Sequence, residues 1–168
     1  MLNIPFYHYK VNNWREKKEQ LLDFVSTLSF KFKDQIADLY TTYGDQTSSK
    51  ALKILEDDIV KFTSEIKYSG EMVAEIWFQK YYENQFHSPH NHGAIGYSSV
   101  LYINFEKRTH DGTRFLAPFN DPDGKHIEFA PDVDEGSLIF FPSYLNHYTL
   151  PNKSDTIRVI MSMNLKRK

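Results

Sequence analysis

Residues 86–93 read Phe-His-Ser-Pro-His-Asn-His-Gly, and an apolar run from Tyr97 to Phe105 follows them. One residue separates His90 from His92, and side chains in an extended strand alternate between its two faces. Both imidazoles are therefore expected on the same face. Two neutral imidazoles side by side make half of a site for a divalent metal ion. The stretch predicts a metal site that needs a third ligand from a distant part of the chain.

His147 is the candidate for that distant ligand. It ends residues 140–147, which read Phe-Phe-Pro-Ser-Tyr-Leu-Asn-His. Arg158 follows eleven positions later and interrupts a β-like run from Thr156 to Asn164. A permanently charged guanidinium inside such a strand needs an anionic partner. We therefore expect a histidine-bound metal and an anion that pairs with Arg158.

Composition limits the class of protein. The chain has 168 residues, of which 40% are hydrophobic, so we expect one globular domain over residues 1–168. A formal charge of −2 gives no electrostatic footprint for nucleic acid or an anionic membrane. There is no cysteine, so a metal must be held by nitrogen and oxygen ligands. No apolar stretch has the length of a membrane span and residues 1–20 lack a signal-peptide core, which makes a cytoplasmic location the default expectation.

The first part of the chain, to about residue 70, has mainly helical periodicity. Apolar residues recur at helical spacing in residues 13–28, and more clearly in residues 49–68. Each predicted helix has one apolar stripe and would be marginal alone, so we expect both to pack on the outside of one sheet. Residues 4–9 alternate as in a short strand. Residues 29–47 fit either strand or helix, and we leave them open.

After residue 70 the period changes to two. Short strands are expected around His90 and His147, and longer ones at residues 72–82, 97–105, 113–117, 125–129, 137–141 and 156–164. Turn formers such as Asp111-Gly112 separate them. Helices followed by about eight strands without a helix between them indicate an α+β domain whose body is an antiparallel sandwich or barrel. This core covers about residues 71–165.

The order of these motifs resembles the iron(II)- and 2-oxoglutarate-dependent dioxygenases over about residues 72–164. The resemblance rests on His90-x-His92 and on the segments at residues 99–104, 136–147 and 158–164. The small members found in bacteria and phages are most similar, and prolyl hydroxylases are more distant. Membership implies a double-stranded β-helix, the cupin-like jelly roll, with the metal in its open mouth. It also implies an oxidoreductase that uses Fe(II) and 2-oxoglutarate, and that hydroxylates a substrate while 2-oxoglutarate becomes succinate and carbon dioxide.

The resemblance assigns roles to individual residues. His90 and His147 occupy the histidine positions of the family's metal triad. Arg158 occupies the position of the cation that pairs with the distal carboxylate of 2-oxoglutarate. Tyr102 matches a tyrosine position of the prolyl hydroxylases, and its hydroxyl is a candidate to bind the same carboxylate. Ser162 shares a strand face with Arg158, so its hydroxyl is a further candidate to bind the same carboxylate.

His92 departs from the family pattern, which has an acid at this position as His-x-Asp or His-x-Glu. Three neutral histidines give the site one more positive charge than the usual triad. Three-histidine sites occur in iron oxygenases of the related cupin shape, and we interpret His92 as the third ligand. His87 is a weaker candidate for the pocket. We interpret His8, His110 and His126 as surface or core residues.

Two functions of different classes remain. The first is a non-haem iron dioxygenase that acts on an unidentified peptide or small-molecule substrate. The second is a non-enzymatic cupin-like module that binds a metal or a sugar, for example in a virion, and whose histidines hold Zn²⁺ or Ni²⁺. Arg158 favours the first, because a plain three-histidine cupin does not need a buried cation. The sequence indicates neither the substrate nor the oligomeric state.

Overall fold

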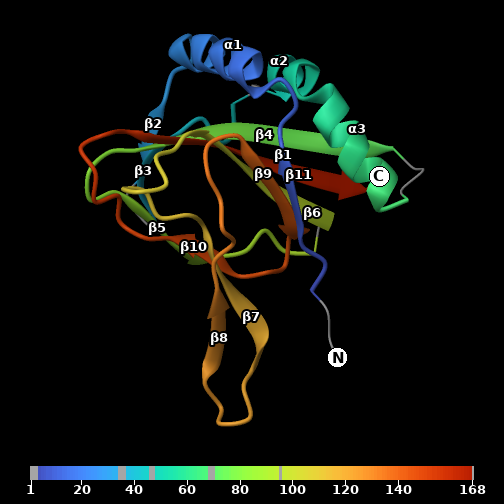
Figure 1. Ribbon diagram of the computed structural model, residues 1–168, viewed down its shortest axis with the longest axis vertical. Coiled ribbons are helices and arrows are strands. Elements are labelled where there is room, and N and C mark those ends of the chain that lie inside the picture. Colours follow the sequence, from blue (N-terminus) through green and yellow to red (C-terminus); the bar gives the residue numbers. More distant parts are fainter. Residues whose placement is uncertain (1–3, 34–36, 46–47, 68–70, 95, 168) are drawn as a thin grey trace.

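The structure is a computed structural model that describes residues 4–33, 37–45, 48–67, 71–94 and 96–167 (Figure 1). Its elements are β1 (Tyr7–Lys10), α1 (Trp14–Ser26), β2 (Lys31–Lys33), β3 (Ala37–Thr41), α2 (Ser48–Ile54), α3 (Glu56–Glu65), β4 (Met72–Tyr81), β5 (Phe86–His90), β6 (Gly96–Asn104), β7 (Arg114–Asn120), β8 (His126–Phe129), β9 (Ser137–Pro142), β10 (His147–Thr149) and β11 (Arg158–Arg167). The strand order is β1-β9-β6-β11-β4-β3-β5-β10-β7-β8, and β2 pairs with β3. Neighbouring strands run antiparallel.

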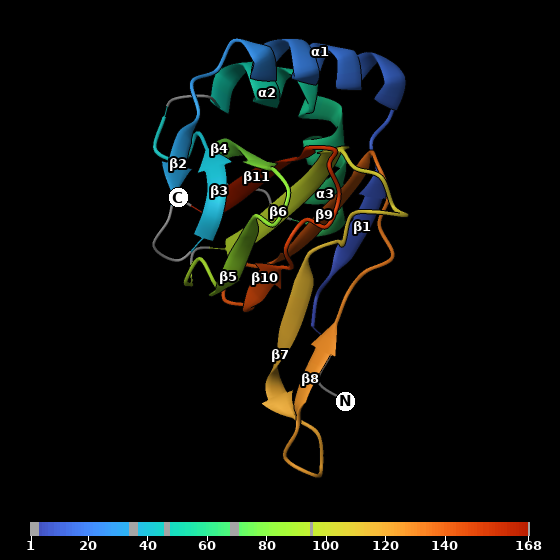
Figure 2. The same ribbon diagram turned by 90° about the vertical axis from the view of Figure 1, so that its left-hand side faces the viewer.

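The sheet folds over on itself at β3. Tyr40 and Thr41 pair with β4, whereas Ala37 and Asp38 of the same strand pair with β5. This arrangement places β5 and β10 across the interior from β4 and β11 (Figure 2). Apolar side chains from both halves fill part of the space between them. The architecture confirms the expected jelly roll, the double-stranded β-helix.

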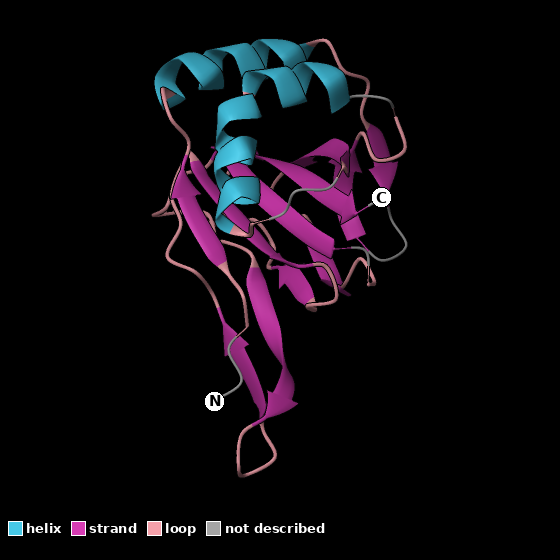
Figure 3. Ribbon diagram, turned by 90° about the vertical axis from the view of Figure 1, so that its right-hand side faces the viewer, coloured by secondary structure: helices cyan, strands magenta, loops and turns pink. Residues whose placement is uncertain are grey.

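The helices cover the outer face of the half that contains β4, β11, β6 and β9 (Figure 3). Leu21 of α1 and Phe62 of α3 are fully buried in one core with Phe78 and Met161 of the sheet. Because strand side chains alternate, the neighbours of Phe78 on β4 face the interior of the jelly roll instead. The expected packing of helices on one sheet is confirmed. Within the described residues, no helix combines the length and the apolar character needed to cross a membrane.

In the first part of the chain, the structure corrects one expectation and answers one question that the sequence left open. Residues 49–68 were expected to form one helix, but α2 ends at Ile54 and α3 begins at Glu56. Leu55, between them, has a non-helical φ of −107° and remains fully buried. The apolar stripe therefore continues through the break, which is why periodicity does not detect it. In residues 29–47, the described parts contain the strands β2 and β3.

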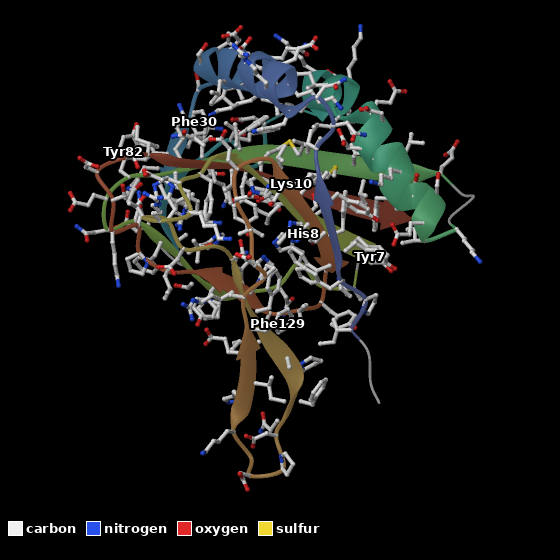
Figure 4. The ribbon with its side chains drawn as sticks, viewed as in Figure 1. Tyr7, His8, Lys10, Phe30, Tyr82 and Phe129 are labelled. Atoms are coloured by element: carbon white, nitrogen blue, oxygen red, sulfur yellow. The ribbon has the colours of Figure 1, made fainter. Side chains whose placement is uncertain are left out.

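The hairpin of β7 and β8 extends away from the body of the molecule (Figures 1 and 2). Phe129 lies at its base, where the hairpin leaves the jelly roll (Figure 4). The Phe129 ring stacks on Phe115 at 5.3 Å and meets the edge of Phe6 at 5.9 Å. This aromatic contact anchors the hairpin on the interior core.

A buried ion pair joins α1 to α3. The Lys17 ammonium donates to Asp58 at 2.6 Å and to Asp57 at 2.5 Å. Asp58 is 2% exposed and also accepts the backbone N–H of Asn12 at 3.0 Å. The replacement Lys17→Met would leave the Asp58 carboxylate buried without its cation. We expect a loss of about 3 kcal/mol in the free energy of unfolding, measured by urea denaturation.

Lys18→Met is the matched control, because Lys18 pairs with Glu135 at a more exposed position. Pairs of that kind contribute at most about 1 kcal/mol. Equal effects of the two substitutions would mean that the buried pair does not support the helical layer.

Candidate metal centre

Antiparallel pairing brings two of the predicted histidines together. His90 is the last residue of β5, His147 is the first of β10, and they are direct partners in the ladder. His92 follows β5, and its backbone N–H donates to the Ser143 carbonyl at 2.8 Å. One ligand atom from each histidine lies within 4.8 Å of the others. The three imidazoles therefore converge, and one divalent ion can contact all of them.

The hydrogen bonds of the three rings leave the same nitrogen free. Each Nδ1 lies within hydrogen-bond distance of an oxygen acceptor. These pairs are His90 Nδ1 with Ser88 O at 2.8 Å, His92 Nδ1 with Asn164 Oδ1 at 2.6 Å, and His147 Nδ1 with Leu145 O at 2.9 Å. An acceptor at Nδ1 holds the proton there, so the lone pair of the neutral ring is on Nε2. Protein metal sites commonly orient histidine ligands in this way.

Burial keeps the rings neutral. Desolvation lowers the pKa of His90 to about 4, and it lowers the pKa of His147 well below its usual value. Burial also lowers the pKa of His92, against a hydrogen bond to Asn164 that raises it. Neutral imidazole is the form that binds a metal. The donor set, three neutral nitrogens with fixed tautomers, fits a first-row divalent ion such as Fe(II).

A cavity of about 320 Å³ adjoins the histidines. Alternate residues of two paired strands form much of its wall. They are Glu75, Trp77, Gln79 and Tyr81 of β4 and Ile160, Ser162, Asn164 and Lys166 of β11. This volume is at the lower end of the range for small-molecule sites in proteins. The cavity offers space for a small ligand beside a metal held by the histidines.

Arg158 is buried beside this cavity, with 1% of its surface exposed. Its guanidinium lies 4.3 Å from the centre of the Tyr81 ring, which is part of the wall, although Arg158 itself is not. Nη1 donates to the Asp111 carbonyl at 2.8 Å and Nη2 to the Leu150 carbonyl at 3.3 Å. Nε has no partner among the described residues. The Asp111 carboxylate pairs with Arg114 at 3.7 Å, and no described acid forms an ion pair with Arg158.

This environment fits an anionic ligand. Burial lowers the pKa of Arg158 from its usual value, but a guanidinium remains charged in proteins. A buried charge without a counter-ion is unfavourable by an amount on the order of several kcal/mol. The unpartnered Nε and the long Nη2 bond leave hydrogen-bonding capacity that a carboxylate can satisfy. The residues present therefore fit both a divalent metal and an organic acid.

Tyr102 and Ser162, the other predicted cosubstrate residues, have different surroundings. Tyr102 is 1% exposed, and its hydroxyl accepts the backbone N–H of Thr113 at 3.1 Å. Burial raises the pKa of Tyr102, and the nearby charge of Arg158 opposes that shift. Ser162 lines the cavity and donates to Gln79 Oε1 at 2.9 Å. Tyr102 therefore lies near Arg158, whereas the hydroxyl hydrogen of Ser162 is donated to Gln79 and not to the cavity.

The remaining histidines lie outside the triad. His87 stacks on His90 with ring centres 3.8 Å apart, and its Nε2 has no partner among the described residues. Burial lowers the pKa of His87 to about 3. His8 and His126 are exposed, and His110 is buried, with hydrogen bonds outside the cavity. His87 therefore lines the cavity without belonging to the triad, and His8, His110 and His126 occupy the surface or core positions expected of them.

The histidines, the cavity and the jelly roll together define a metal-dependent protein of the double-stranded β-helix class. The chain belongs to the family whose model is described as "Putative 2OG-Fe(II) oxygenase", which matches residues 75–164. It is therefore an oxidoreductase of the Fe(II)- and 2-oxoglutarate-dependent family, and the expected family, enzyme class and cofactors are confirmed. A comparison with curated protein sequences found no match.

Solved structures have the same fold. A prolyl-4-hydroxylase from Pseudomonas putida is 15% identical with a TM-score of 0.71, over 99% of this chain and 94% of that one. A prolyl hydroxylase from Trichoplax adhaerens, in complex with a hypoxia inducible factor peptide fragment, is 14% identical with a TM-score of 0.68, over 96% and 83%. The epimerase SnoN from nogalamycin biosynthesis is 10% identical with a TM-score of 0.75, over 98% and 78%. At these identities the likeness concerns the fold alone.

Proposed function

We propose that the protein hydroxylates a peptide or small-molecule substrate in a reaction coupled to the oxidation of 2-oxoglutarate. The observation that supports this most is Arg158, a buried guanidinium with an unpartnered Nε beside a cavity that three histidines adjoin. A histidine cluster alone suits many metal-binding proteins. A buried cation ready for an organic acid is the additional feature that a 2-oxoglutarate-dependent oxygenase needs.

In this proposal each predicted residue has one role. His90, His92 and His147 hold Fe(II) through Nε2, and Arg158 pairs with the distal carboxylate of 2-oxoglutarate. Tyr102 lies beside that pair. When bound, Fe(II) and 2-oxoglutarate supply the activation of dioxygen: one oxygen atom enters succinate, the other enters the substrate, and carbon dioxide leaves.

Ser162 acts indirectly in this proposal, by orienting Gln79. Its hydroxyl donates to Gln79 Oε1, and Gln79 Nε2 lies 3.4 Å from His87 Nδ1. Trp77 belongs to the same wall, with its ring centre 5.6 Å from that of His92. We propose that these side chains exclude water and position the substrate next to the metal.

The substrate class follows the range of the similar structures. One of them is in complex with a peptide fragment, and another is an epimerase from nogalamycin biosynthesis. The cavity of this chain has apolar and polar wall residues side by side, which suits either class. We therefore propose a peptide or a small molecule as the substrate.

Titration of 2-oxoglutarate into the Fe(II)-loaded protein without oxygen tests the proposal. We expect a saturable charge-transfer absorption band, because the 2-oxo acid can chelate the metal. Glutarate is the matched control ligand: it has both carboxylates but no 2-oxo group, and it should give no such band. Tight Fe(II) binding without a band for 2-oxoglutarate would contradict the proposal and support a non-enzymatic metal-binding module.

A further inference from the structure

A row of polar side chains crosses the sheet beside His92. Asn164 on β11 lies directly opposite Glu75 on β4 and directly opposite Ser98 on β6. Asn164 is 4% exposed and Ser98 is 1% exposed. Buried polar groups need hydrogen-bond partners, so the partners of this row call for an explanation. We call Glu75, Asn164 and Ser98 the polar row.

The contacts of Asn164 give its amide a fixed direction. Its Oδ1 is 2.6 Å from His92 Nδ1 and 2.9 Å from Ser98 Oγ, which donates to it. Its Nδ2 donates to Glu75 Oε2 over 3.4 Å. The amide oxygen therefore faces the histidine and the amide N–H₂ faces the carboxylate. This direction makes His92 Nδ1 a donor and leaves Nε2 as the metal-binding atom.

Glu75 has a second partner with an opposing effect. Its Oε2 lies 3.1 Å from the Lys166 ammonium, and both residues belong to the cavity wall. Only the Asn164 amide separates this carboxylate from His92, because the amide contacts both. The Glu75 carboxylate therefore lies one side chain away from His92, and the Lys166 ammonium partly neutralises its charge.

We propose that Glu75 strengthens metal binding at His92 from outside the ligand set. The carboxylate orients the Asn164 amide, and the amide oxygen polarises His92 Nδ1–H, which makes Nε2 a better donor. The carboxylate also supplies nearby the negative charge that a triad of neutral imidazoles lacks. Glu75 and Asn164 are positioning residues in this account. The proposal rests on the metal-binding role proposed above for His90, His92 and His147.

Two substitutions with opposite expected effects test the proposal. Glu75→Gln removes the charge but keeps the shape, and we expect Co(II) to bind about tenfold more weakly, the lower limit for loss of an outer partner. Lys166→Met removes the competing cation, and we expect Co(II) to bind more tightly. The Co(II) affinity is measured by competition with a chelator. A purely structural role of Glu75 would not predict a gain in Lys166→Met, because that substitution breaks the same ion pair.

Glu128→Gln is the matched control. Glu128 also pairs with a basic side chain, Arg114, but on the β7–β8 hairpin and outside the cavity wall. Its removal should leave Co(II) affinity unchanged. Glu75→Gln within twofold of the wild type, or weaker binding in Lys166→Met, would overturn the proposal while leaving the proposed function intact. A wild-type protein that does not bind Co(II) would overturn both.

Discussion

Replacement of His147 by alanine is expected to weaken Fe(II) binding by at least about a hundredfold. Loss of an outer partner of a metal ligand typically costs ten- to a hundredfold in affinity, and loss of the ligand itself should exceed that. His147 is the ligand that comes from a different strand, β10, and it is 5% exposed, so water does not readily replace it. Competition with a chelator gives the affinity of the folded protein.

His110→Ala is the control for this experiment. His110 is also buried, at 6% exposure, and its hydrogen bonds join Glu106 to Thr156 outside the cavity wall. Its removal should lower the free energy of unfolding but leave Fe(II) affinity unchanged. Similar metal affinities in wild type and His147→Ala would exclude the histidine triad as the metal site.

Replacement of Arg158 by methionine is expected to weaken 2-oxoglutarate binding by at least about tenfold. A hydrogen bond to a charged group contributes roughly 1.5–3 kcal/mol, and about 1.4 kcal/mol corresponds to a factor of ten. Fe(II) affinity should remain unchanged. The protein should also lose some stability, because the carbonyls of Asp111 and Leu150 lose their donor. The affinity is measured by the oxygen-free titration under conditions in which the variant is folded.

Two further variants make the Arg158 experiment specific. Arg158→Lys keeps a positive charge but loses the planar fork, so its 2-oxoglutarate affinity should lie between those of wild type and Arg158→Met. Arg15→Met removes an exposed arginine of α1, outside the cavity wall, and it should have no effect. Unchanged affinity in Arg158→Met would show that the buried cation serves the fold and not the cosubstrate.

Sequence periodicity predicted the secondary-structure elements around the site, because periodicity depends on local geometry. Alternation with a period of two in residues 72–82 and 156–164 corresponds to β4 and β11, and helical spacing located α1. The convergence of His90 with His147 was predicted from motif order, and strand pairing accounts for it. His92 is different. It follows β5, and its place depends on a backbone bond to Ser143 that alternation does not describe.

Contacts that depend on strand register were not predictable from the sequence. Glu75 and Asn164 are far apart in the chain, and only the pairing of β4 with β11 makes them neighbours. Register is a property of the whole sheet, and a shift by one residue would turn each side chain to the other face. Gln79 was missed for the same reason, because its contact with Ser162 crosses the same two strands. The alternation in residues 72–82 puts Glu75 and Gln79 on one face but does not indicate which face borders the cavity.

The oxygen-dependent conversion of 2-oxoglutarate to succinate by the Fe(II)-loaded protein tests the central claim most directly. The claim predicts succinate from the wild type, even if slowly without a substrate, and far less from His147→Ala and Arg158→Met. A wild-type protein that demonstrably holds Fe(II) and binds 2-oxoglutarate, yet forms no succinate in the presence of oxygen and of peptide and small-molecule candidates, would contradict it.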